Sequence, residues 1–279
     1  MMIAQSNDPT VYVSGSFDDL RTIDIRFLQE ASRLGRVHAL LFSDTSAQNL
    51  HQQTLKYPAA ERLYFLENIR FIDQVSVVET DSTDLLPIDH HGDNGDQVTW
   101  AVRESDANAR KSAFCAARGI NLAPIPDTAL AGFPIAEIPA DRSNKKVMVS
   151  GCFDWVHSGH VRFFEEAASF GDLYVVVGHD ENLRLLKGAH HPMFSQEERR
   201  YWVHAIRFVH RAVISSGHGW LDAEPEVLTY HPDMFIVNHD GDKPEKRRFF
   251  KEIGVEYRVL ERRPKKGLKA RESTHLRGF

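Results

Sequence analysis

Apolar residues along the chain form short continuous runs, which alternate with segments where apolar residues recur every three or four positions. In the second half, the continuous runs predict strands at residues 147–150, 173–177, 212–214, 234–237 and 255–260. The helical spacing, with a Ser-x-x-Glu capping box at Ser195, predicts helices at residues 161–168, 195–208 and 243–253. Strands that alternate with helices favour an α/β fold with a doubly wound parallel sheet.

The first half of the chain repeats this pattern. Residues 11–18 and 147–154 both contain a β-branched apolar run and end in Ser-Gly-x-Phe-Asp. Three further matches follow in the same order, and they pair residues 31–35 with 167–171, 61–71 with 198–208, and 117–120 with 252–255. Four matching segments that occur in the same order in both halves indicate a duplication. We therefore predict two tandem Rossmann-like domains, residues 9–133 and 145–279, joined near residues 134–144.

Composition and charge narrow the class of protein. The 279 residues are 42% apolar and 26% charged, as in globular proteins of one or two domains. No apolar run approaches the roughly 18 residues of a membrane span, no signal peptide is visible, and two cysteines are too few for a disulfide framework. These features predict a cytoplasmic protein.

The net charge of −5 argues against a general nucleic-acid binder, but it conceals an asymmetry. Residues 1–144 carry 12 basic and 20 acidic side chains, a net of −8, whereas residues 145–279 carry 22 and 19, a net of +3. Eleven of the 15 histidines lie in the second half. The two halves therefore suggest different functions.

Ligands of open parallel sheets bind beyond the carboxyl ends of the strands, so residues 151–160 are the first place to expect a site. Gly151 lets the backbone approach a ligand, and His157 and His160 lie on one face at the start of a helix. Two imidazoles and free backbone N–H groups at a helix N-terminus suit a phosphate. The position of the two histidines also fits two other interpretations, half of a metal site or a pair of ordinary surface histidines. The common dinucleotide, P-loop and metalloprotease motifs are absent.

The segment Gly151-x-Phe153-Asp154-x-x-His157-x-Gly159-His160 resembles the His-x-Gly-His signature of the cytidylyltransferase-like nucleotidyltransferases. That family includes glycerol-3-phosphate and ethanolamine-phosphate cytidylyltransferases and heptose-phosphate adenylyltransferases. The resemblance extends through residues 145–279. It includes the family's lysine segment, its Glu-Arg…Ile-Arg-x-Val helix and its C-terminal Ser-Thr motif, at Lys187-Gly188, Glu198-Arg199, residues 206–209 and residues 271–277.

The resemblance implies that an acceptor phosphate attacks the α-phosphorus of a nucleoside triphosphate and that pyrophosphate leaves, without a covalent enzyme intermediate. It implies catalytic roles for His157, His160 and Lys187. It implies nucleotide or phosphate contacts for Gly151, Cys152, Phe153, Asp154, Gly159, Arg199, Arg207, Asp240, Arg271, Ser273 and Thr274. Mg²⁺ is expected with the triphosphate rather than on protein ligands.

The residues alone leave other roles open for several of these side chains. Lys187 also fits a solvated loop lysine, Arg199 a helix-surface charge, and Ser273 or Thr274 a helix N-cap. The chain departs from the family pattern at His210 and at residues 238–242. These departures leave the nucleobase and the acceptor undecided.

The leading functional hypothesis is transfer of CMP from CTP to a small phosphorylated alcohol, as in phospholipid biosynthesis. The alternatives are an ATP-dependent adenylyltransferase acting on a sugar phosphate or coenzyme precursor, and a non-catalytic nucleotide sensor.

The first copy has Arg21 and Asp24 in place of the two histidines, and Leu50 near the place of Lys187. An aspartate there repels a triphosphate. We therefore predict that residues 9–133 retain the fold, lack the site and act as a built-in partner. Such a pseudo-dimer within one chain is also compatible with a homo-oligomer of whole chains.

Overall fold

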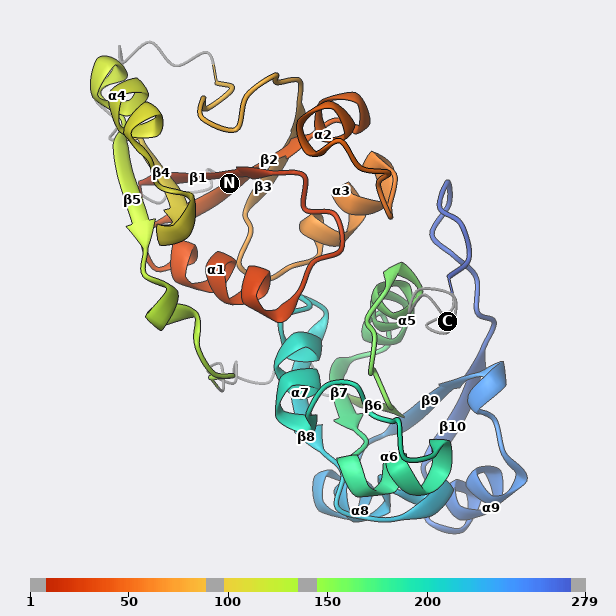
Figure 1. Cartoon of the computed structure of the whole chain (residues 1–279). Helices are drawn as coiled ribbons and strands as arrows, with labels where there is room; N and C mark the ends of the chain where they lie inside the picture. Colours follow the sequence, from red (N-terminus) through yellow and green to blue (C-terminus); the bar gives the residue numbers. More distant parts are fainter. Residues whose placement is uncertain (1–8, 89–97, 135–144, 272–279) are drawn as a thin grey trace, which may run out of the picture. The chain divides into compact units, whose positions relative to one another are not determined.

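The computed structural model describes residues 9–88, 98–134 and 145–271, and the chain divides into two compact units, Met1–Gly132 and Phe133–Phe279 (Figure 1). Unit 1 contains β1 (Thr10–Gly15), α1 (Thr22–Ser32), β2 (Arg36–Phe42), α2 (Asp44–His51), α3 (Ala59–Glu67), β3 (Gln74–Val78), β4 (Thr99–Arg103), α4 (Ala109–Arg118) and β5 (Asn121–Ile125). Unit 2 contains β6 (Lys146–Gly151), α5 (Ser158–Ala168), β7 (Asp172–Val177), α6 (Asp180–Lys187), α7 (Gln196–His204), β8 (Val209–Ile214), α8 (Glu224–Tyr230), β9 (Met234–Asn238), α9 (Pro244–Glu252) and β10 (Glu256–Leu260).

Both units have one and the same sheet topology. The strand order is β3-β2-β1-β4-β5 in unit 1 and β10-β9-β6-β7-β8 in unit 2, and every pairing is parallel. In each unit the first strand is therefore central and lies between the second and the fourth. This topology confirms the prediction of two tandem Rossmann-like folds and makes β1 equivalent to β6.

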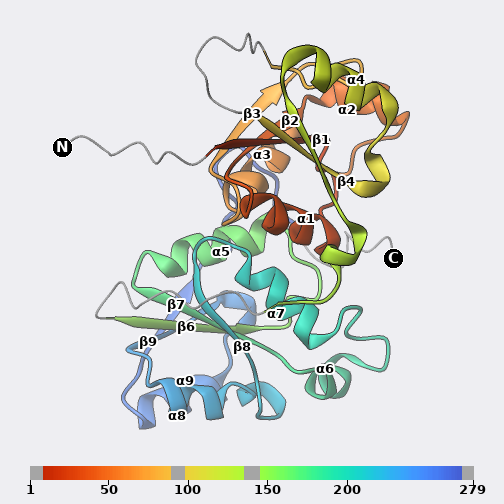
Figure 2. The ribbon, with the colours of Figure 1, turned by 90° about the vertical axis from the view of Figure 1, so that its left-hand side faces the viewer.

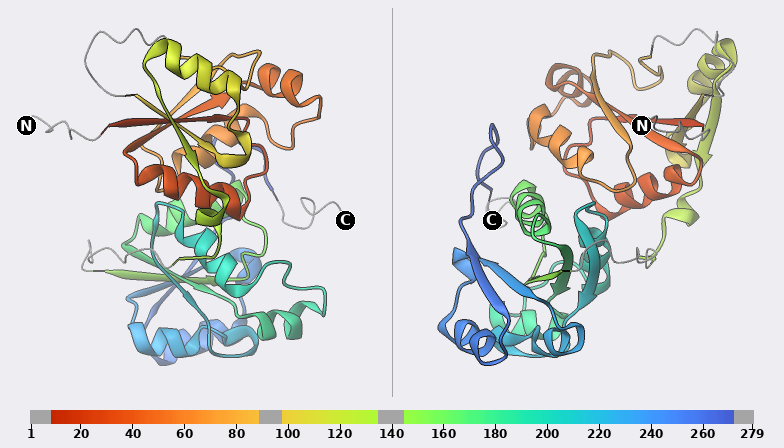
Figure 3. Two further views of the ribbon diagram at one scale, coloured as in Figure 1. Left: turned by 60° about the vertical axis from the view of Figure 1, so that its left-hand side comes forward. Right: turned by 180° about the vertical axis from the view of Figure 1, so that it is seen from behind.

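Helices cover both faces of each sheet. In unit 2, α5 and α7 lie on one face, and α8 and α9 lie on the other (Figures 2 and 3). All six residues of β7 are buried, as its continuous apolar run predicts. None of the helices in the described segments is both long and apolar enough to cross a membrane.

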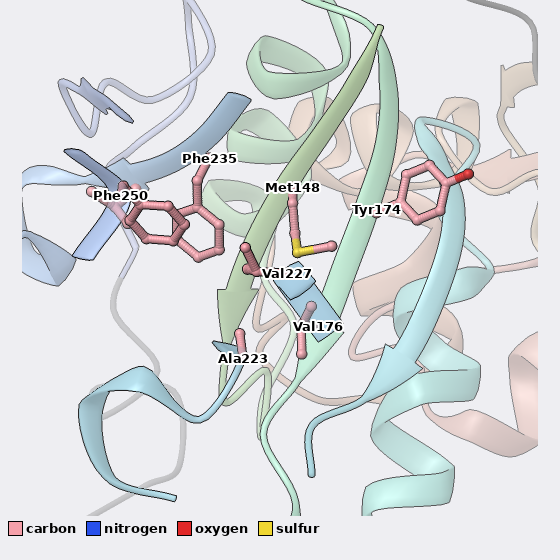
Figure 4. Close-up of a cluster of buried hydrophobic side chains, with 8 residues drawn as sticks. Met148, Tyr174, Val176, Ala223, Val227, Phe235 and Phe250 are labelled. Carbon is pink, nitrogen blue, oxygen red and sulfur yellow. The ribbon is translucent and has the colours of Figure 1, made fainter. Parts of the chain in front are cut away.

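The core on the α8–α9 face of unit 2 joins these helices to the sheet (Figure 4). Phe250 of α9 stacks on Phe235 of β9 with ring centroids 4.2 Å apart. The other buried members of this cluster are Met148, Tyr174, Val176, Ala223, Val227 and Val237. The packing fixes the inner face of α9 against the sheet.

The structure confirms the predicted elements of unit 2, with shifted ends. Helix α5 begins at Ser158, three residues before the predicted start, and α7 ends at His204 rather than near residue 208. Helices α6 and α8 were not predicted, because eight and seven residues are too few to establish a helical period.

A buried arginine connects three segments of unit 2. Arg199 of α7 is 1% exposed, and its guanidinium donates to the carbonyl oxygens of Cys152 and Phe194 at 2.7 and 3.0 Å. Its third nitrogen pairs with the Asp180 carboxylate at 2.6 Å, in the first turn of α6. The turn after β6 is therefore held to α6 and to the loop before α7.

Unit 1 contains the same network. Arg62 of α3 is 1% exposed, donates to the carbonyls of Ser16 and Tyr57, and pairs with Asp44 at 2.7 Å. These partners occupy the positions that Cys152, Phe194 and Asp180 occupy in unit 2. The arginine thus belongs to the fold that both units share.

The turn that this arginine holds is also the same in both units. Phe17 and Phe153 adopt left-handed backbone with φ of 48° and 50°. Asp154 accepts hydrogen bonds from the backbone N–H groups of residues 193 and 194, and Asp18 accepts them from residues 56 and 57. The Ser-Gly-x-Phe-Asp sequence therefore encodes this turn.

We predict that Arg62→Met destabilises unit 1 by at least about 2 kcal/mol, because buried carbonyl groups lose their donors. Native-state hydrogen exchange of peptides from β1 and β2 measures the change. The control is Arg33→Met, since Arg33 forms an exposed ion pair with Glu30 that contributes little. A loss for Arg62→Met as small as that of the control would contradict the assignment.

Candidate functional site

A cavity of about 740 Å³ lies at the carboxyl ends of the strands of unit 2. The turn after β6, helices α5, α6 and α9, and the segments after β9 and β10 contribute to its wall through residues that include Asp154, His160, Lys187, Asp240, Lys246 and Arg262. A second cavity of about 280 Å³ shares Asp240 and Arg262 with the first and is also bordered by Gly159 and Arg271. Both cavities lie where parallel sheets bind ligands.

His157 is the N-cap of α5, and its imidazole folds back over the first turn. Its Nδ1 accepts a hydrogen bond from the backbone N–H of Gly159 at 3.1 Å. A Cβ at Gly159 would lie 2.9 Å from Cε1 of that ring, so the position requires glycine. Because Nδ1 accepts, the neutral imidazole carries its proton on Nε2. Within the described residues this buried Nε2 has no hydrogen-bond partner.

His160 stands directly beside His157, with ring centroids 4.0 Å apart. Phe153 contacts the His160 ring edge-to-face at 5.4 Å. A Cβ at Gly151 would lie 2.8 Å from Cζ of Phe153, which explains the glycine at the end of β6. Gly151, Phe153 and Gly159 therefore act by shaping the two imidazoles.

Both histidines are held neutral. Burial lowers the pKa of His157 to about 3, and the charges of Arg262 and Arg271 act in the same direction. Burial also lowers the pKa of His160 well below its usual value, and neighbouring His157, Arg262 and Lys187 add to this shift. Both rings are therefore neutral and stand among cationic side chains, an arrangement that favours a polyanion. His160 lines the large cavity, whereas His157 is fully buried and lines neither cavity.

Lys187 is the last residue of α6, and it lines the large cavity. Gly188 follows it with φ of 93° and ends the helix. Because α2 and α6 both have eight residues, His51 of α2 is the counterpart of Lys187. The counterpart lies one residue beyond Leu50, which sequence comparison had placed near this position.

Three predicted ligands have other partners in the structure. The carboxylate of Asp154 binds backbone N–H groups, and Arg199 is committed to the network described above. Cys152 contributes its carbonyl to Arg199, and burial raises the pKa of its thiol. Since Asp18 and Arg62 repeat this arrangement in unit 1, the geometry favours a scaffold role for Asp154 and Arg199.

The remaining predicted ligands fall into three groups. Asp240 pairs with Arg262 at 2.9 Å, and Arg262 also donates to the carbonyl of Arg271, so these residues lie together at the smaller cavity. Arg207 is exposed in the turn before β8, at the amino edge of the sheet, and it lines neither cavity. Its position favours a surface role. The predicted Ser273 and Thr274 lie outside the described residues.

Sequence reasoning missed Arg262 and Lys246. Arg262 belongs to the basic run that follows β10, so its place at a strand carboxyl end was a usable signal. Lys246 lies on the inner face of α9 and resembles a surface lysine in the sequence.

Among the residues that the structure describes, no group of three or more His, Cys, Asp or Glu side chains is arranged to hold a metal ion. Two of the carboxylates that line the large cavity are already bound, Asp154 by backbone N–H groups and Asp240 by Arg262.

The cytidylyltransferase-like family model matches residues 148–274. An FAD synthase from Methanopyrus kandleri is 37% identical over 121 residues, which cover 41% of this chain and 77% of that protein. The chain belongs to the cytidylyltransferase-like nucleotidyltransferases.

Two further relatives of this nucleotidyltransferase differ in size. The bifunctional protein HldE of Campylobacter curvus is 40% identical over 114 residues, which cover 40% of this chain and 24% of that protein. The solved structure of a lipopolysaccharide core biosynthesis protein from Thermoplasma volcanium is 24% identical, covers 43% of this chain and 98% of its own, and has a TM-score of 0.37. The family assignment confirms the resemblance drawn from the His-x-Gly-His segment and makes the chain an enzyme.

We predict that the His157 imidazole of the ligand-free nucleotidyltransferase stays neutral from pH 8 to about pH 5 and takes up a proton only near pH 3. Because its pKa is lowered, proton uptake at pH 5 is confined to the unfolded chain, where histidine titrates near 6.5. Nitrogen chemical shifts of labelled histidine, assigned with His157→Gln, measure the titration. A midpoint above about pH 5.5 in the folded protein would refute this electrostatic description.

Proposed function

We propose that this nucleotidyltransferase transfers an adenylyl group from ATP to a small phosphorylated acceptor and releases pyrophosphate. The proposal rests on one observation at the N-terminus of α5. There the buried Nε2–H of His157 has no hydrogen-bond partner among the described residues, and the charges of Arg262 and Arg271 act on its ring. The choice of ATP over the CTP favoured by sequence reasoning rests on the relative named FAD synthase. FAD contains AMP joined to FMN through a pyrophosphate, so its synthesis is an adenylyl transfer.

The chemistry requires positioning and charge stabilisation. An oxygen of the acceptor phosphate attacks the α-phosphorus, the bond to the β-phosphate breaks, and pyrophosphate leaves with the electron pair. His157 and His160 donate N–H groups whose hydrogen bonds strengthen as negative charge moves onto the leaving group. The N-terminal amides of α5 add to the same field.

Permanent cations hold the reactants. Lys187 lies on the α6 side of the large cavity, and Arg262 and Arg271 lie at the smaller cavity beside Gly159. We assign the two arginines to the triphosphate and Lys187 to the phosphates that meet during transfer. Mg²⁺, when bound, neutralises phosphate charge. It would be held by phosphate oxygens and water, because the carboxylates of Asp154 and Asp240 have other partners.

Unit 1 is proposed to lack this activity. A cavity of about 590 Å³ remains at the ends of its strands, but its chemistry differs. Arg21 takes the N-cap position of His157, and Asp24 takes the position of His160 and forms an ion pair with Arg103. A carboxylate at this position repels a triphosphate.

We predict that pyrophosphate release requires ATP rather than CTP when the four triphosphates are tested against FMN and a panel of sugar phosphates and phospho-alcohols. Turnover with CTP and none with ATP would contradict the proposed nucleotide.

His160→Ala is expected to lower kcat/KM by about a hundredfold or more, as removal of a transition-state donor does. The matched control is His231→Asn, which changes an exposed histidine at the end of α8 and keeps a residue that tolerates its left-handed backbone. The control should retain full activity. A loss below about tenfold for His160→Ala would place the reaction elsewhere.

A further inference from the structure

Lys246 is a buried lysine that faces the large cavity of unit 2. It is 9% exposed, lies on α9 and lines the cavity. Phe250, four residues further along the same face, stacks on Phe235 of β9. The core packing therefore holds the Lys246 stem between α9 and the sheet and leaves its ammonium group at the cavity wall.

Within the described part of the chain, the Lys246 ammonium makes no hydrogen bond and no ion pair within 4 Å. Burial lowers its pKa, and the carboxylate of Asp222 acts in the opposite direction. Asp222 also lines the cavity and accepts a hydrogen bond from Ser215 at 3.2 Å. A donor and an acceptor thus stand on one wall without contacting each other.

In unit 1 the equivalent lysine forms a closed pair with a carboxylate. Lys111 of α4 occupies the position of Lys246, is 6% exposed and lines the cavity of its unit. Its Nζ lies 2.9 Å from the carboxylate of Asp84, which comes six residues after the end of β3, whereas Asp222 comes eight residues after the end of β8. The lysine is satisfied within the protein in the unit that lacks the histidines, and it has no such partner in the unit that has them. This difference indicates that the partner of Lys246 is a group on a bound ligand.

The wall around Lys246 defines the chemistry of that group. Trp220, two residues before Asp222, lines the cavity and is 54% exposed, and Leu183 and Leu186 add apolar surface. An ammonium donor and a carboxylate acceptor together match a carbonyl next to an N–H, as in an imide. The Lys243 ammonium lies over one face of the Trp220 indole, 4.9 Å from its centroid, and the other face of the indole matches a flat aromatic ring.

The location separates this wall from the triphosphate. Asp222 follows β8, and a Cβ at Gly178, after β7, would lie 3.2 Å from its carboxylate. Arg262 follows β10, at the opposite end of the sheet. Asp222 therefore lies toward the β8 end of the sheet, away from Arg262, and Lys246 reaches this end from α9, which contacts the turn Gly219–Leu221. We assign this end of the cavity to the acceptor of a triphosphate that is bound at α5 and the arginines.

We propose that Lys246 and Asp222 bind the end of the acceptor remote from its phosphate, a planar heteroaromatic ring with an imide edge, and that Trp220 stacks on this ring. This inference rests on the proposed function and adds the chemical class of the acceptor. FMN, whose ring system carries such an edge, is the probe.

Lys246→Met keeps the length of the side chain and removes its charge. With ATP and FMN as substrates, we expect the KM for FMN to rise about tenfold to a hundredfold, the loss typical of one charge-assisted hydrogen bond. The KM for ATP and kcat should change less than about threefold. Asp222→Asn should raise the KM for FMN in the same way and should abolish the preference of the enzyme for FMN over its N3-methyl derivative, which lacks the imide N–H.

Two lysine variants separate binding from folding. Lys251→Met changes an exposed lysine on α9 and should change nothing. Lys111→Met breaks the closed pair of unit 1 and should lower thermal stability without raising the KM for FMN. If Lys246→Met instead raised the KM for ATP, or left both KM values unchanged, the proposal would be wrong.

A binding measurement on the unaltered enzyme serves if Lys246→Met fails to fold. Flavin fluorescence should be quenched when FMN binds, and Trp220→Leu should remove most of this quenching. Absence of FMN binding overturns the inference. ATP-dependent pyrophosphate release with a sugar phosphate but none with FMN also overturns it while the proposed function stands, whereas no ATP-dependent release with any acceptor overturns the proposed function itself.

Discussion

A buried guanidinium holds each unit of this protein in shape at the place where chemistry would occur. Arg199 binds the carbonyl of Cys152 directly after β6, the carbonyl of Phe194 before α7, and the carboxylate of Asp180 in α6. Removing this group would leave buried acceptors unpaired, which costs more than most surface contacts contribute. The positions of the turn after β6, and of the α6 helix that ends at Lys187, both depend on it.

The duplication separates scaffold from chemistry inside one chain. Both units retain the buried arginine, the phenylalanine with left-handed backbone, and the aspartate that accepts hydrogen bonds from the loop before the third helix of the unit. They differ at the N-terminus of the first helix, where unit 2 has two adjacent neutral histidines and unit 1 has Arg21 and an aspartate paired with Arg103. The side chains that differ between the units are those that can contact a bound phosphate. The family's chemistry is therefore expected in unit 2.

The sequence was most informative where the signal is local. Continuous apolar runs marked the buried strands, and the spacing of His157 and His160 marked the helix start that holds them. The hydrogen-bond partners of Arg199 lie 5, 19 and 47 residues away in the sequence. Sequence spacing therefore does not show whether Arg199 is a buried structural residue or a phosphate ligand. A usable signal did exist, because Arg62 and Asp18 persist in the copy that has lost the histidines. Helices α6 and α8, of eight and seven residues, are too short for periodicity to reveal.

Each unit has a cavity at the carboxyl ends of its strands, and we infer that the cavity of unit 2 is the one that binds the triphosphate. Calorimetric titration of the full chain with a non-hydrolysable ATP analogue measures this directly. The account predicts one equivalent per chain, lost on combined substitution of His157 and His160 by alanine and unchanged by Arg103→Ala. Two equivalents, or one that survives the histidine substitutions and disappears with Arg103→Ala, would contradict it.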